Sequence, residues 1–142
     1  MGDFERLNKK ARQEMGKVLD PSERVLIAYQ GDSAALVATD RRIHIAKYGF
    51  QCGLAGKCRV SSWGLAEITE IEFHVAAMAD GGMRSIIVHA PGLAPLTKFG
   101  LFGSGPESVW ESPNALFVKK GELDGVLTTL RGLVADHQAA GA

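Results

Sequence analysis

The pattern of apolar and polar positions is most regular in two short stretches joined by a tight turn. The first stretch, residues 34–39, is an apolar run with β-branched side chains, which favours a strand. Asp40 begins the turn, because its carboxylate can accept a hydrogen bond from the backbone that follows. Residues 42–45 then alternate, with Ile43 and Ile45 on one face and Arg42 and His44 on the other. The pattern predicts a β-hairpin at the centre of the fold.

Six further stretches have the composition or the alternation of strands. They are residues 24–30, 57–63, 67–75, 84–90, 96–102 and 114–118, the last of which could be a final strand. Residues 67–75 alternate most clearly, with Thr69, Ile71, Phe73 and Val75 on one face. Turn residues such as Gly31-Asp32 and Asp80-Gly81-Gly82 separate these stretches. We therefore expect about seven short strands in antiparallel pairing.

Helical spacing marks both ends of the chain. In residues 3–19 apolar side chains recur every three or four positions, and Pro21 ends the helix. In residues 122–137 the same spacing is almost unbroken. The first helix has two interpretations, a surface-binding arm or an ordinary helix packed on its own domain or on a partner subunit. Its nearly balanced charges favour the second interpretation.

This order predicts a mainly β fold, a bent antiparallel sandwich or barrel of about seven strands capped by the C-terminal helix. The apolar stripe of that helix suits the open end of a sheet that bends over itself. We expect an N-terminal helical arm over residues 1–20 and one domain over residues 21–142. Residues 103–113 are rich in Gly, Ser and Pro and longer than a hairpin needs, which indicates an inserted loop.

Composition narrows the class of protein. The 142 residues include 16 basic and 16 acidic side chains, so no net charge draws the chain to nucleic acid or to an anionic membrane. No apolar run reaches the ~20 residues that span a bilayer, and the charged N-terminus is unlike a signal peptide. We therefore expect a cytoplasmic protein. Cys52 and Cys58 are too far apart for a redox pair and lack a second pair for a zinc site.

Patterns of catalytic and metal-binding residues are weak. Ser104 lacks the Gly-x-Ser-x-Gly spacing of a nucleophile turn, and the chain has no Walker loop or dinucleotide fingerprint. His44, His74 and His89 would hold a metal only if their strands met on one sheet face. Two of them share a face with charged neighbours, which indicates exposure to solvent. We expect no enzymatic activity, no cofactor and no metal.

Three segments resemble a known family. They are Glu23-Arg24-Val25-Leu26 leading to Gly31, Leu36–Ile43, which is similar to an LTDRRL signature, and Glu67–Ile71 after Trp63. Over about residues 23–137 the chain therefore resembles the bacterial pleckstrin-homology (PH-like) domains. The resemblance implies two bent antiparallel sheets capped by a C-terminal helix. It also implies a binding or assembly module without enzymatic activity, which in some members forms ring-like oligomers.

Candidate contact residues lie in two places. The first hairpin offers Asp32 and no base, which argues against phosphoinositide binding there. Arg41 and Arg42, in the next turn, either bind a phosphate or a partner's carboxylate, or form a solvated turn paired with a nearby acid. Trp110 lies in the inserted loop, shortly after Phe102, and is either a contact residue or buried by the loop folding back.

From these observations we expect a non-enzymatic PH-like module that self-associates or binds another protein. The candidate contact residues are Arg41, Arg42, Phe102 and Trp110. One alternative is a peripheral membrane-binding or lipid-binding module that acts through the N-terminal helix or the two arginines. A small metal-dependent enzyme on a β scaffold is a third alternative, which the sequence favours least.

Overall fold

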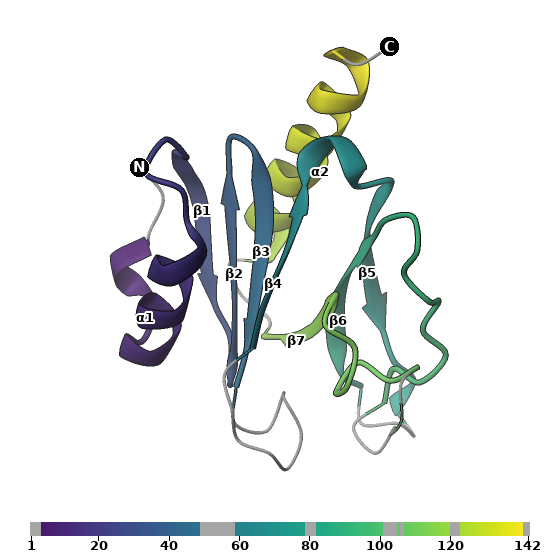
Figure 1. The fold of residues 1–142 in the computed structure, drawn as a ribbon. Helices are drawn as coiled ribbons and strands as arrows, with labels where there is room; N and C mark the ends of the chain where they lie inside the picture. The colour runs from purple at the N-terminus through teal and green to yellow at the C-terminus, as the bar shows by residue number, and fades with distance from the viewer. Residues whose placement is uncertain are drawn as a thin grey trace.

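The computed structural model describes residues 4–48, 59–78, 82–100, 105, 107–119 and 123–140 of the chain. In chain order the elements are η1 (Phe4–Arg6), α1 (Lys9–Val18), β1 (Val25–Gln30), β2 (Ala34–Thr39), β3 (Arg42–Lys47), β4 (Arg59–Gly64), η3 (Leu65–Glu67), β5 (Glu70–Val75), β6 (Arg84–His89), β7 (Ala115–Val118) and α2 (Leu123–Ala140). The strands form two antiparallel sheets, which confirms the predicted mainly β fold with a C-terminal helix (Figure 1).

Sheet A contains β1 to β4 in chain order, and its centre is the predicted hairpin. Ala34 pairs with Lys47, and Ala38 pairs with Ile43, so the expected hairpin is confirmed. The turn differs in one detail. Thr39 Oγ1, and not the Asp40 carboxylate, accepts hydrogen bonds from the backbone that follows. Asp40 Oδ1 instead accepts from the backbone N–H of Arg24 and holds the start of β1 against the turn.

Sheet B contains β5, β6 and β7, and two predictions fail around it. The predicted strand over 67–75 begins only at Glu70, because residues 65–67 form a 3₁₀ turn that places Ile68 in the core. The predicted strand over 96–102 is absent from its described part, up to residue 100. There a single parallel bridge joins Lys98 to Ser108.

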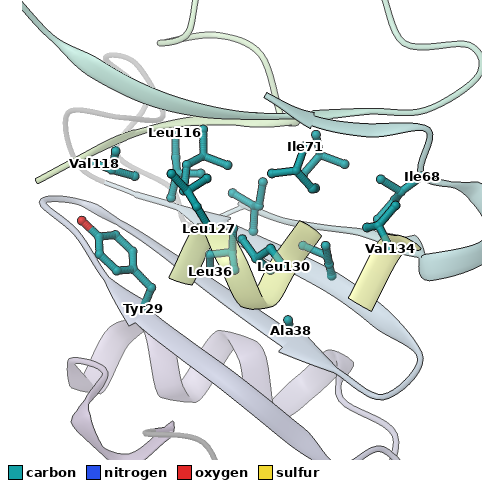
Figure 2. Packing of buried hydrophobic residues seen from close by; sticks show 14 of the residues in the cluster. Tyr29, Leu36, Ala38, Ile68, Ile71, Leu116, Val118, Leu127, Leu130 and Val134 are labelled. Atoms are coloured by element: carbon teal, nitrogen blue, oxygen red, sulfur yellow. The ribbon is translucent and has the colours of Figure 1, made fainter. Parts of the chain in front are cut away.

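Helix α2 lies between the two sheets, as the apolar stripe predicted (Figure 1). Figure 2 shows Leu127, Leu130 and Val134 among side chains from both sheets. Ile71 and Leu116 contribute from sheet B. Burying each large aliphatic side chain contributes about 1.5 to 3 kcal/mol, so this wedge is the main apolar core.

Helix α1 covers the outer face of sheet A, so the first helix packs on its own domain (Figure 1). Ala11 and Met15 are fully buried against Ala35, Val37 and Ala46. The helix is shorter than the predicted residues 3–19, because the Asn8 side chain accepts a hydrogen bond from the Ala11 N–H and caps its start. Strand β2 is consequently buried on both faces.

Membrane-spanning segments were not expected from the sequence. No helix among the described residues is long and apolar enough to cross a membrane. The residues Cys52, Cys58, Phe102 and Ser104 lie outside the described residues.

Candidate functional site

The turn between β2 and β3 carries the two predicted arginines, and Arg42 pairs with the buried Glu23 carboxylate, with 34% of the Arg42 side chain exposed. Its Nε donates to Glu23 Oε1 at 2.9 Å and its Nη2 to Glu23 Oε2 at 2.6 Å, a bidentate charge-assisted pair. Nη2 also donates to the Val18 carbonyl oxygen. The hydrogen bonds from Arg42 hold the pKa of Glu23 far below its ordinary value of 4.5, and Glu23 raises the pKa of Arg42. Arg42 therefore already pairs with a carboxylate of its own chain, Glu23.

Arg41 points the other way and is exposed. Its Nη1 donates to Ser22 Oγ at 2.8 Å, and that hydroxyl donates to Asp20 Oδ1 at 2.7 Å. The hydrogen bonds from Ser22 lower the pKa of Asp20. The two arginines consequently do not form one binding site for a phosphate, and Arg41 is the more exposed of the two.

His44 is fully buried, which corrects the expectation that it points to solvent. Its face is shared with Arg42, as predicted, but α1 and the Glu23 side chain cover that face. The other two histidines lie on sheet B, where His74 stacks on Phe99 and His89 contacts the Glu72 carboxylate. The described residues contain no cluster of His, Cys, Asp and Glu that could hold a metal.

A groove opens beside these charged residues, between the N-terminal segment and the start of β1. Its volume is about 560 Å³, and apolar atoms make up most of its wall. The lining residues are Phe4, Glu5, Leu19, Pro21, Ser22, Glu23, Arg24 and Val25. Arg41 adjoins it through the hydrogen bond to Ser22. The structure thus places Arg41, one of the predicted contact residues, next to a groove that sequence patterns did not predict.

Trp110 is partly buried in the folded loop between β6 and β7. Its ring makes an edge contact with Phe117, with centroids 4.4 Å apart, and it packs on a cluster that includes Leu96 and Val109. Of the two interpretations, the loop folding back on the domain is the one that the structure favours. Trp110 still has a partly exposed side, so its role as a contact residue stays a prediction.

Lys47 fixes this loop and was missed by the sequence analysis. Its side chain is buried, and its Nζ donates to the carbonyl oxygens of Val109, Trp110 and Ser112. A lysine at the end of an alternating strand gives no signal of this role, because its acceptors are backbone atoms more than 60 positions away. Glu23 was also missed as a hydrogen-bonding centre, because its side-chain partners Thr39, Arg42 and His44 lie 16 to 21 positions further along the chain.

Comparisons with known proteins extend this description. Neither a protein-family model nor a curated protein matches the chain. Among solved structures, the chain is similar to a pleckstrin-homology domain from Shewanella amazonensis SB2B, with a TM-score of 0.55 and 17% sequence identity over 88% of this chain and 86% of that chain. This chain has the fold of a bacterial pleckstrin-homology domain. A protein with such a domain from Shewanella loihica PV-4 is similar at a TM-score of 0.50, with 20% identity over 91% of each chain.

The first hairpin of this PH-like fold has the acidic character that the sequence indicated. Gly31 N donates to the Ala34 carbonyl oxygen, and Ser33 adopts a left-handed conformation with φ of 59°. Asp32 is exposed and pairs with Lys119, which follows β7, at 2.8 Å. The hydrogen bond that Lys119 donates to the Asp32 carboxylate raises the pKa of Lys119. The weakness of this hairpin as a phosphoinositide site stays a prediction.

Proposed function

We propose that this PH-like chain is a binding module that contacts a second copy of itself or another protein. The observation that carries the proposal is the groove beside β1. Phe4, Leu19 and Val25 are only partly buried there, although they pack on the cluster between α1 and sheet A. A protein segment with an apolar side chain would complete that cluster and remove more apolar surface from water.

The charged residues around the groove indicate which charge such a segment should carry. The oxygens of Glu23 already accept hydrogen bonds within the chain, so they offer little to a cationic partner. Arg24 lines the groove, and Arg41 adjoins it through its hydrogen bond to Ser22. Both side chains are exposed, long and rotatable. A carboxylate on the incoming segment would pair with these guanidinium groups, which sets orientation more than affinity.

Self-association is tested by light scattering on the full chain at increasing concentration. We expect a mass above that of the 15.2 kDa monomer at about 1 mM, where even an association of about −4 kcal/mol is half populated. Arg24→Glu reverses a charge at the groove and should weaken the association. Arg12→Glu makes the same change on an exposed position of α1 and should leave it unchanged. A strict monomer for all three proteins would overturn the self-association half of the proposal.

Binding to another protein is tested by photo-crosslinking in cells. A benzoylphenylalanine replaces Pro21 in the groove, and a control protein carries it at Arg12. We expect one discrete crosslinked product from the groove position only. A monomer that gives no groove-specific product would refute the binding module. Salt-sensitive sedimentation with anionic liposomes would instead favour the lipid-binding alternative.

A further inference from the structure

Three hydrogen-bonded side chains cross the outer face of sheet A and end at an exposed serine on β4. Ser62 Oγ lies 2.6 Å from His44 Nδ1, and His44 Nε2 lies 3.3 Å from Glu23 Oε1. Ser62 is exposed, whereas the side chains of His44 and Glu23 are 0% and 1% exposed. A hydroxyl, an imidazole and a carboxylate in this order are the parts of an activated nucleophile.

The pairing of β3 with β4 produces this contact. Leu65 N donates to the Arg41 carbonyl oxygen, so hydrogen-bonded pairs recur at every second residue from that point. His44 and Ser62 are therefore opposite each other in a non-hydrogen-bonded pair, in which side chains approach most closely. It follows that the backbone N–H of Ser62 points away from β3, toward the edge of sheet A that β4 forms.

The hydrogen bonds around His44 define which ring nitrogen can accept a proton. Nε2 faces the Glu23 carboxylate, which can only accept, so Nε2 carries the hydrogen. Nδ1 is then the unprotonated nitrogen and accepts from the Ser62 hydroxyl. Burial lowers the pKa of His44 below its ordinary 6.5, against the opposing effect of Glu23 and with a smaller contribution from Arg42. The ring is thus neutral at pH 7 and able to act as a base.

We propose that Ser62 is an activated serine that accepts an acyl group from a carboxylic ester. Its Oγ forms a bond to the carbonyl carbon, the hydroxyl proton moves to His44 Nδ1, and the imidazolium returns that proton to the departing alkoxide as the ester C–O bond breaks. Glu23 is the positioning residue that holds the ring. The outward N–H of Ser62 can donate to the oxyanion, as the N–H of a nucleophilic serine does in other proteins.

An alkyl fluorophosphonate tests this inference on the intact chain, because its adduct is irreversible. Ser62 Oγ displaces fluoride from phosphorus, and the proton leaves through His44. Peptide mass mapping should find the adduct on Ser62, at least about 100-fold faster than on Ser61, since a general base contributes about 10² to 10⁴. Ser61 is the matched control, because it lies on the same strand and faces away from His44. Labelling should persist in Ser61→Ala and disappear in Ser62→Ala.

Two measurements separate activation from a purely structural hydrogen bond. The labelling rate of the wild-type chain should be constant above pH 7 and fall in acid as His44 gains a proton, and it should be lost in urea. His44→Gln should lower the rate by at least about 100-fold. Equal labelling of Ser61 and Ser62, or no adduct in the folded chain, would overturn the proposal. Neither result affects the proposed binding function, because Ser62 and His44 do not line the groove.

Discussion

At the scale of single residues, Glu23 connects three parts of the chain. Its two buried oxygens accept hydrogen bonds from Asp20 N, Thr39 Oγ1, Arg42 and His44. A buried carboxylate is costly unless its hydrogen bonds are satisfied, and here both oxygens have several donors. The link after α1 is therefore held to the β2–β3 turn by one acidic side chain.

Replacing Arg42 by lysine should destabilise the fold, because an ammonium cannot make the bidentate pair and reach the Val18 carbonyl as well. We expect Arg42→Lys to lower the free energy of unfolding by about 1 to 3 kcal/mol. Arg41→Lys, the same change at the exposed neighbour, should stay within about 0.5 kcal/mol. Urea unfolding of both variants measures the difference. Equal losses for the two variants would contradict the stabilising role of the hydrogen bonds from Arg42 to Glu23 and Val18.

Acid should destabilise the chain in two steps. The pKa of buried His44 is below 6.5, so the unfolded state binds the extra proton first and stability falls as the pH drops through that region. The pKa of Glu23 is also lowered, so its contribution is present above pH 4.5 and is lost as the pH falls further. Urea unfolding between pH 8 and pH 3 tests this, and His44→Gln should remove the upper step. A flat profile above pH 5 in the wild-type chain would refute it.

At the scale of elements, the sequence predicted those whose pattern is complete within one stretch. The β2–β3 hairpin and α2 have their own alternation or helical spacing, and both were found where expected. The predicted strand failed over residues 96–100, because their apolar side chains pack with the β6–β7 loop on side chains of β6 and β7, and only one bridge pairs their backbone. The charged centre at Glu23 and the buried Lys47 were beyond prediction, since each depends on partners far apart in the chain.

The loop between β6 and β7 should depend on Lys47. Lys47→Met keeps the length of the side chain but leaves three carbonyl oxygens without their donor. We expect a loss of about 2 to 4 kcal/mol, since an unsatisfied buried group costs about 1 to 3 kcal/mol. Hydrogen exchange should also accelerate at residues 107–112. Lys119→Met removes a lysine from an exposed pair and should cost less than about 1 kcal/mol. Unchanged exchange in Lys47→Met would show that the loop holds itself.

At the scale of the whole molecule, the two helices pack on opposite faces of sheet A. Helix α1 covers its outer face, and α2 packs between its inner face and sheet B, while β3 and β7 bring the two sheets into direct contact (Figure 1). Sheet A is therefore covered on both faces, and β2 is buried along its whole length. The first helix is therefore packed against sheet A through its apolar side chains.

The free energy of unfolding should depend on the packing of α2 between the two sheets. Leu130 is fully buried between the sheets, so Leu130→Ala should cost about 2 to 5 kcal/mol. Thr129→Ala, at the exposed neighbouring position, should change stability by less than about 0.5 kcal/mol. Thermal unfolding of the two variants gives the comparison. A small effect of Leu130→Ala would mean that the two sheets hold together without this helix.

The three hydrogen bonds from Lys47 to the β6–β7 loop limit which sequence changes the loop can accept. Its ammonium binds main-chain oxygens, which every amino acid carries, so exchanges of side chains at positions 109, 110 and 112 leave the acceptors in place. An insertion or deletion between these positions would move an acceptor out of reach. Among homologous proteins that keep this lysine, the segment that corresponds to residues 109–112 should therefore vary in amino-acid sequence but not in length.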